Sequence, residues 1–247
     1  MRFTMDCPMK LRSIGWLVVV SLTLSRTTSG QDFQDLDFES ATLVPVPGNA
    51  YGSIQFASAF PGWTQTIVGG LLGTNALYNN LFLDSAGIGI FDQNSSFLSS
   101  DVIEGNYTAI LESGLGYTQT GLVPSDVILS QTGLVPFWTK SLQFKANNWF
   151  DSSGAFAVML GGQTLSLTVL GSGPNYTLYG AEVSQWANQT AQLSFTVFGE
   201  TPHVNNEIFF LDDIQFSPSS VPEPNTLCLI ALGALLFGLR RIKLIQY

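Results

Sequence analysis

The sequence is poor in histidine, cysteine and basic residues. It holds one histidine, two cysteines, and nine lysines and arginines among 247 residues. One imidazole and two thiols fall short of the ligand sets that are typical of catalytic zinc. A hydrolase triad would depend on His203, which lies in a Pro- and Asn-rich stretch typical of a solvated loop. These absences argue against both classes of enzyme, whereas a glycosidase, which needs only two carboxylates, is not excluded.

Basic residues are almost absent from the middle of the chain. Between residues 31 and 239 only Lys140 and Lys145 are basic, whereas every acidic residue except Asp6 lies there, for a net charge of about −15. This charge argues against nucleic acid and anionic membrane surfaces as partners, because affinity for phosphate depends on Lys and Arg. Cys7 and Cys228 lie near the two ends, so no disulfide is expected in the roughly 190 residues between them, which are enough for one domain with its own core.

The C-terminal tail has three features in a fixed order. Pro222, Glu223 and Pro224 come first, an uncharged run at residues 227–239 follows, and Arg240 and Arg241 close it. Two prolines around a carboxylate predict an extended, accessible peptide. The apolar run with its basic flank predicts a transmembrane helix over residues 226–239, although its thirteen uncharged residues cover only about 20 Å of a roughly 30 Å hydrocarbon core.

This order resembles the PEP-CTERM sorting signal of Gram-negative bacteria, which would occupy residues 219–247. The resemblance implies processing by exosortase, an integral-membrane cysteine transpeptidase. Pro222, Glu223 and Pro224 would then be the recognition element, and Arg240 and Arg241 would anchor the helix on the cytoplasmic side of the inner membrane. The alternative is an ordinary C-terminal anchor in which the prolines form only a linker.

The N-terminus also indicates export. Residues 1–30 combine a basic start, an apolar stretch at residues 14–24 and the small residues Thr28, Ser29 and Gly30. This arrangement predicts a signal peptide, with a buried N-terminal helix as the alternative. We therefore expect an exported protein that passes through a membrane-anchored intermediate and ends at the cell surface or outside the cell.

Residues 31–218 are predicted to form one β-domain. Polar and apolar residues alternate at residues 141–146, 155–160 and 192–198, and Gly161 and Gly162 predict a hairpin turn before a strand at residues 164–170. Further strands are expected at residues 87–91, 107–111, 126–130, 175–179 and 208–216, with one helical turn near residues 183–188. This number of strands favours an antiparallel two-sheet β-sandwich, specifically a jelly roll.

The stretch from residue 131 to residue 216 resembles exported bacterial proteins with galactose-binding-like, carbohydrate-binding-module jelly rolls. The matching pieces lie at residues 131–136, 141–144, 173–180, 186–187 and 211–214, and residues 36–39 and 61–63 resemble the start of such modules. The resemblance implies a fold more firmly than an activity.

Calcium is the metal that this composition favours, because hard cations take several oxygen ligands. Strand alternation predicts that Asp212 shares a face with Phe210, Ile214 and Phe216 and points toward the core, where an unpartnered carboxylate is costly. The resemblance implies a structural calcium between Glu39 and Asp212, with Asp213 and Asp37 as second choices for the ligands. The alternative is that Asp212 lies at a strand end and bonds to a turn.

Aromatic residues are the usual platforms for sugar rings. Trp138 and Trp149 lie beside turn-forming residues and are the predicted glycan-binding residues, whereas most other aromatic residues are expected in the core. The leading hypothesis is a non-enzymatic surface or biofilm-matrix protein that binds extracellular polysaccharide. The alternatives are a glycan-active enzyme that uses carboxylates and a purely structural adhesin.

Overall fold

The computed structural model describes residues 31–49, 52–69, 73–82, 85–95, 102–118, 121–148, 156–199 and 208–222. The predicted signal peptide (residues 1–30) and the predicted transmembrane helix (residues 226–239) lie outside these ranges. Among the described residues, no helix has the length and apolar character needed to cross a membrane.

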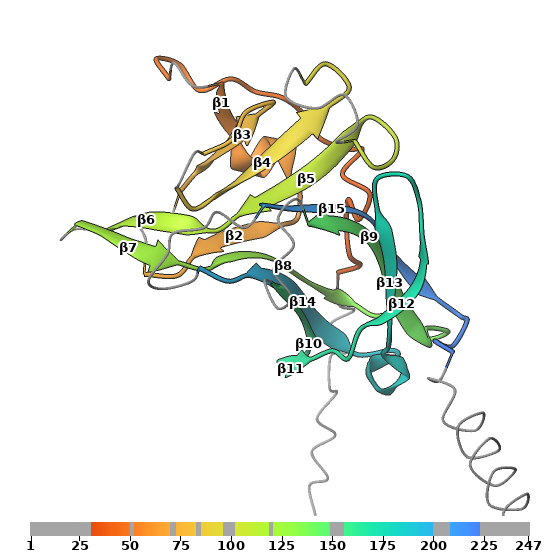
Figure 1. The fold of residues 1–247 in the computed structure, drawn as a ribbon. Coiled ribbons are helices and arrows are strands. Elements are labelled where there is room, and N and C mark those ends of the chain that lie inside the picture. Colours follow the sequence, from red (N-terminus) through yellow and green to blue (C-terminus); the bar gives the residue numbers. More distant parts are fainter. Residues whose placement is uncertain are drawn as a thin grey trace, which may run out of the picture.

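The larger of two facing sheets has eight strands (Figure 1). In spatial order they are β1 (Ser53–Gln55), β3 (Asn75–Tyr78), β4 (Gly87–Asp92), β5 (Tyr107–Glu112), β15 (Ile208–Ser217), β9 (Ser141–Asn148), β13 (Thr177–Glu182) and β12 (Thr168–Ser172). The C-terminal strand β15 lies in the middle of this sheet, between β5 and β9. The C-terminal end of the domain therefore lies at the centre of the larger sheet.

The smaller sheet has five strands, and a separate hairpin projects beside it. The five strands are β11 (Gln163–Thr164), β10 (Phe156–Leu160), β14 (Thr190–Val197), β8 (Val127–Leu134) and β2 (Thr64–Ile67). The hairpin consists of β6 (Gly114–Thr118) and β7 (Gly121–Ser125). The two short helices are α1 (Phe56–Ala59) and the 3₁₀ turn η1 (Ser184–Trp186).

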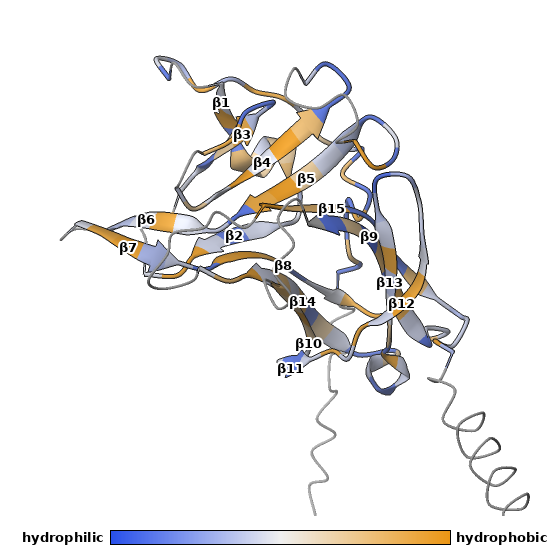
Figure 2. Cartoon of the chain, in the orientation of Figure 1, coloured by the Kyte–Doolittle hydropathy of each residue, from blue (hydrophilic) through white to orange (hydrophobic). Residues whose placement is uncertain are grey.

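The main core fills the space between the two sheets. Ile90 and Leu111 from the larger sheet pack with Leu129 and Phe195 from the smaller one, and all four are fully buried. A second cluster, called the outer cluster here, lies on the opposite face of the larger sheet and comprises Leu81, Phe91, Ile110, Ile208 and Phe210. β4 and β5 are therefore apolar along most of their length instead of strictly alternating (Figure 2).

The predicted two-sheet β-sandwich is confirmed, with two differences in detail. β3 and β4 pair in parallel, so the larger sheet is mixed and not purely antiparallel. The single strand predicted at residues 164–170 is wrong. The chain forms β11 in the smaller sheet and then β12 in the larger one, because it crosses between the sheets after the turn at Gly161 and Gly162.

Candidate functional site: an acidic pocket and an exposed aromatic loop

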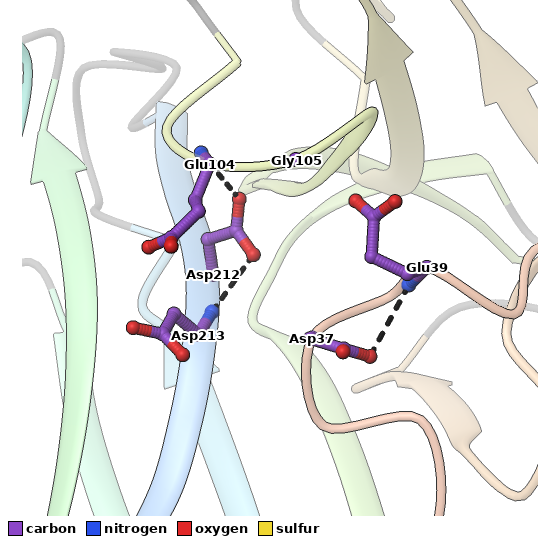
Figure 3. A pocket seen from close by; sticks show the side chains of 6 residues that line it. All are labelled: Asp37, Glu39, Glu104, Gly105, Asp212 and Asp213. Atoms are coloured by element: carbon purple, nitrogen blue, oxygen red, sulfur yellow. Dashed lines mark hydrogen bonds between the residues drawn. The ribbon is translucent and has the colours of Figure 1, made fainter.

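An acidic pocket lies where the N-terminal segment, the loop before β5 and the strand β15 meet. The cavity measures about 240 Å³. Its lining residues are Asp37, Glu39, Glu104, Gly105, Asp212 and Asp213 (Figure 3). Glu39 and Asp212, the pair that the resemblance implies for calcium, therefore line one pocket although they are 173 positions apart in the sequence.

Glu39 holds the loop before β5 by its side chain. Its carboxylate accepts hydrogen bonds from the Asn106 backbone N–H (2.7 Å), the Asn106 side-chain amide (2.7 Å) and the Tyr107 N–H (3.0 Å). Gly105 makes this approach possible. It has a φ of +63°, and a Cβ atom there would collide with the Glu39 carboxylate.

Asp212 holds the same loop from the other side. Only 1% of its surface is exposed, and it accepts hydrogen bonds from the Glu104 N–H (3.1 Å), the Thr108 hydroxyl (2.6 Å) and the Asp213 N–H (2.7 Å). Burial raises the pKa of Asp212 to about 7. The hydrogen bonds from Thr108 and Asp213 oppose that rise, and the charges of Asp213 and Glu39 add to it. The hydrogen bonds therefore compensate the buried charge only in part.

Regular alternation along β15 sets the direction of Asp212, and a bulge follows directly after it. Phe209 and Leu211 face the main core, so Phe210 and Asp212 face the outer side of the sheet. Pairing with β9 then shifts between Asp212 and Gln215, and Asp213 has a positive φ of 45°. Ile214 therefore returns to the main core, and its N–H donates to the Leu36 carbonyl (2.9 Å).

The structure corrects the predicted placement of Asp212. Asp212 does share a face with Phe210, but this face carries the outer cluster and not the main core, and Ile214 and Phe216 pack on the opposite, main-core face. The bond between Ile214 and Leu36 brings the N-terminal segment to β15 beside the Asp212 carboxylate. The pocket is thus built by one extra residue in an otherwise regular strand.

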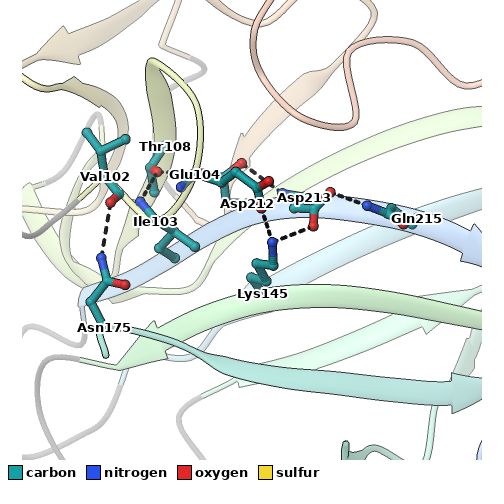
Figure 4. A network of polar contacts seen from close by, with 9 residues as sticks. All are labelled: Val102, Ile103, Glu104, Thr108, Lys145, Asn175, Asp212, Asp213 and Gln215. Carbon is teal, nitrogen blue, oxygen red and sulfur yellow. Dashed lines mark hydrogen bonds and ion pairs between the residues drawn. The ribbon is translucent and has the colours of Figure 1, made fainter. Parts of the chain in front are cut away.

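Lys145 on β9 is the basic residue nearest the pocket. Its ammonium group pairs with Asp213 at 2.8 Å and also with Glu104, and it lies 5.2 Å from the centre of the Tyr176 ring. Figure 4 shows Lys145 between these carboxylates, with Asn175 fastening the chain at Val102 nearby. The predicted ligand Asp213 is therefore neutralised by an ion pair, whereas Glu39 and Asp212 have only hydrogen-bond donors.

The fit to calcium is partial. Within the described ranges, no three Asp, Glu, His or Cys side chains converge closely enough to hold a metal ion in the present arrangement. A carboxylate has about four lone-pair sites. Glu39 and Asp212 each accept three hydrogen bonds from the groups named above, which leaves one site on each that could face a cation.

Asp35 is a second carboxylate whose burial raises its pKa, and the sequence did not indicate it. Its Oδ2 is buried without a hydrogen-bond partner, while Oδ1 accepts the Ser40 N–H at 2.8 Å. Burial raises its pKa to about 6, and the hydrogen bonds from Ser40 offset part of that effect. Glu104, Gly105 and Thr108 were also missed, although a glycine in a polar loop directly before a strand is a recognisable signal for a tight approach.

An exposed aromatic loop joins β8 to β9. Phe137 is 78% exposed and Trp138 is 44% exposed, in contrast to Trp63 and Trp186, which are buried in the main core. The loop is closed by the Thr139 N–H, which donates to the Pro136 carbonyl (3.1 Å). The expected exposure of Trp138 is therefore present, whereas Trp149 lies outside the described residues.

The folded domain leads directly into the tail motif. Pro222 is exposed and is the last described residue. Glu223, Pro224, Arg240 and Arg241 lie beyond it. Residues 220–242 match the family model described as the PEP-CTERM protein-sorting motif. The chain carries a PEP-CTERM sorting motif. This motif implies export, sorting to the cell surface or extracellular space, and processing by exosortase.

Solved structures provide remote likenesses. TmCBM61 in complex with β-1,4-galactotriose has 13% sequence identity and a TM-score of 0.34, with 76% of this chain and 97% of that chain covered. The K2 cleaved adhesin domain of Lys-gingipain has 14% identity and a TM-score of 0.40, with 73% and 95% covered. The secreted serine protease VesC from Vibrio cholerae has 10% identity and a TM-score of 0.28, with 66% and 42% covered. No curated protein matches the chain significantly.

Proposed function

We propose that this PEP-CTERM protein is a non-enzymatic component of the cell surface or extracellular matrix whose sandwich, a jelly roll, binds extracellular polysaccharide. Its C-terminal segment holds it in the inner membrane until exosortase acts. The observation that carries the polysaccharide proposal is the exposed pair Phe137 and Trp138 on one short loop.

The loop has the properties of a sugar platform. Two adjacent aromatic side chains in water are costly unless a ligand covers them, and a sugar's apolar face stacks on such rings. The loop is fixed at both ends, since the Val135 N–H donates to the Gln189 carbonyl (2.9 Å) and the Lys140 N–H donates to the Ser217 carbonyl (2.8 Å). A fixed loop loses little conformational entropy on binding, which favours affinity.

We extend the proposal to a structural calcium ion in the acidic pocket. Five carboxylates line this cavity, and Lys145 pairs with only two of them. Glu39 and Asp212 would be the central ligands, each through its remaining lone pair, with Asp37 completing the set after a side-chain movement. A divalent cation there would offset the charge that hydrogen bonding leaves uncompensated at Asp212.

One observation bears on the alternative of a glycan-active enzyme. A carboxyl group with a pKa near 7 beside other carboxylates is the pattern of a general acid and its partner. Asp212 is only 1% exposed, however, and its oxygens accept bonds from the loop before β5, so a glycosidic oxygen would not reach it. We therefore favour a binding protein over a hydrolase.

Native affinity gels that contain soluble neutral polysaccharides would test the proposal with the full chain in a sugar-free detergent. We expect retardation of the wild type in at least one of a galactan, a glucan and a mannan, and its loss in Trp138→Ala and Phe137→Ala. Val169→Ala is the matched control, because Val169 is also an exposed apolar residue (62%) but lies on β12. A wild type that no polysaccharide retards would favour the structural adhesin instead.

A further inference from the structure

A second cavity, separate from the acidic pocket and the aromatic loop, lies beside the hairpin β6–β7. It has a volume of about 470 Å³, within the range of small-molecule sites. The polar residues that line it are Asn49, Ser53, Asn80 and Ser85. Phe82 and Tyr117 contribute two aromatic rings, and none of these lining residues carries a charge.

The walls of this cavity come from distant segments that are tied together. Ser85 forms a parallel bridge with Leu115 on β6, and the Ala86 N–H donates to the Leu115 carbonyl (3.0 Å). The Phe82 N–H donates to the buried Glu112 carboxylate (2.8 Å). The Phe82 ring lies against Gly87, where a Cβ atom would collide with it. The cavity is therefore built into the fold before any ligand arrives.

The lining chemistry selects a ligand class. Amides and hydroxyls both donate and accept hydrogen bonds, which suits a molecule with many hydroxyl groups. Tyr117 is 64% exposed at the cavity edge, so its ring face is available to stack on an apolar sugar face. The net charge of about −15 between residues 31 and 239 disfavours an anionic sugar.

We propose that this cavity binds one neutral hexose unit of a polysaccharide, with Tyr117 as its stacking platform. The inference rests on the proposed polysaccharide binding and adds a second subsite and the class of sugar. The aromatic loop lies on the β8–β9 connection and the cavity on β1, β3 and β6, so the two subsites are separate and can be tested separately.

Ligand-observed saturation-transfer NMR on the full chain in sugar-free detergent micelles would test the subsite. The probes are the methyl β-galactoside and methyl β-glucoside, each compared with its uronic acid, which differs by one carboxylate. We expect a neutral hexoside to bind about tenfold more tightly than its uronic acid, equivalent to about 1.4 kcal/mol. Equal or stronger binding of the uronic acid would overturn the assignment to a neutral sugar.

Three variants test whether hexoside binding occurs at Tyr117. Tyr117→Ala is expected to weaken hexoside binding about tenfold, and Tyr117→Phe, which keeps the ring, to change it less than about threefold. Leu122→Ala is the matched control, because Leu122 is the exposed cross-strand partner of Tyr117 and does not line the cavity. Wild-type hexoside binding in Tyr117→Ala would overturn the proposal.

Trp138→Ala separates this inference from the proposed function. That variant is expected to lose retardation by polysaccharide while keeping the hexoside signal. If Trp138→Ala loses polysaccharide binding and Tyr117→Ala keeps hexoside binding, the role of the aromatic loop is supported and the subsite is refuted. If no polysaccharide retards the wild type but Tyr117→Ala still loses hexoside binding, the subsite is supported and the role of the aromatic loop is refuted.

Discussion

At the scale of single residues, Asp212 should make the stability of the domain depend on pH. Its folded pKa of about 7 exceeds the ordinary aspartate pKa of 3.8. Between these values the folded protein holds a proton that the unfolded chain has released, so the free energy of unfolding falls as pH rises from about 4 to about 7. At about 1.4 kcal/mol for each pKa unit, the fall is at most about 4 kcal/mol.

Asp212→Asn removes the titrating group and tests this prediction by thermal unfolding at several pH values. The variant should be more stable than the wild type at pH 8 without calcium. It should also lose the slope between pH 6 and 7 while keeping part of the slope below pH 6, where Asp35 with a pKa of about 6 titrates in the same sense. Asp32→Asn removes one exposed charge outside the pocket and serves as the control. A profile of Asp212→Asn that runs parallel to the wild type would contradict this account.

Gly105 offers a second test at this scale. Gly105→Ala should destabilise the domain by about 2–3 kcal/mol, because the new methyl group combines positive-φ strain with a collision against the Glu39 carboxylate. Gly48→Ala is a matched control, since Gly48 has a similar φ of +77° but no atom within 4 Å of the added Cβ. It should cost only about 1 kcal/mol. Equal losses in the two variants, measured by chemical denaturation, would mean that the Glu39 contact contributes nothing.

At the scale of elements, calcium should couple the N-terminal segment, the loop before β5 and the strand β15. With an affinity of about 0.1 mM, typical of extracellular sites, 10 mM calcium would raise the free energy of unfolding by about 2.7 kcal/mol. The stabilisation should exceed that of magnesium, which demands stricter octahedral geometry. It should disappear in the double variant Glu39→Gln/Asp212→Asn. Identical melting temperatures in calcium and in EGTA at pH 7.5 would refute the site.

Alternation along single strands predicted much of the fold. β9, β10 and β14 lie close to the predicted ranges because their polar and apolar residues alternate. The prediction of one strand over residues 164–170 failed because alternation gives no information about which sheet a strand joins. β4 and β5 are buried on both faces, so their apolar runs locate strands without predicting the outer cluster that covers them.

The candidate site was predictable only at the level of residue pairs. Glu39 and Asp212 were predicted together and line one pocket. All but one of the donors to their oxygens come from residues 104–108, which no local pattern connected to them, and the exception is the Asp213 N–H. The bulge at Asp213 could not be predicted from the sequence either, because the positive φ of this residue depends on pairing with β9. The exposure of Trp138 was predictable because Pro136 and its neighbours mark a turn.

At the scale of the whole molecule, the folded domain ends where the sorting motif begins. The Ser219 carbonyl accepts the Ser141 hydroxyl (2.7 Å), and the half-buried Val221 packs beside Gly180 on β13. Pro222 is exposed immediately afterwards. Almost no linker therefore separates the sandwich from the motif. An enzyme that binds the motif must approach the surface formed by β9 and β13.

This geometry leads to a prediction about sorting. Prolines at positions 222 and 224 keep the peptide from continuing a helix, so replacing Pro222, Glu223 and Pro224 by Ala, Gln and Ala should let helical structure extend toward the domain and hide the motif. The variant should accumulate in the inner membrane with its C-terminal peptide intact, and mass spectrometry of membrane and surface fractions would detect this. Pro218→Ala is the matched control, because it removes an exposed proline that precedes the motif at residues 220–242 and should leave sorting unchanged. Normal release of the triple variant would show that the motif is only a linker, and an equal block in Pro218→Ala would assign the effect to the end of the sandwich.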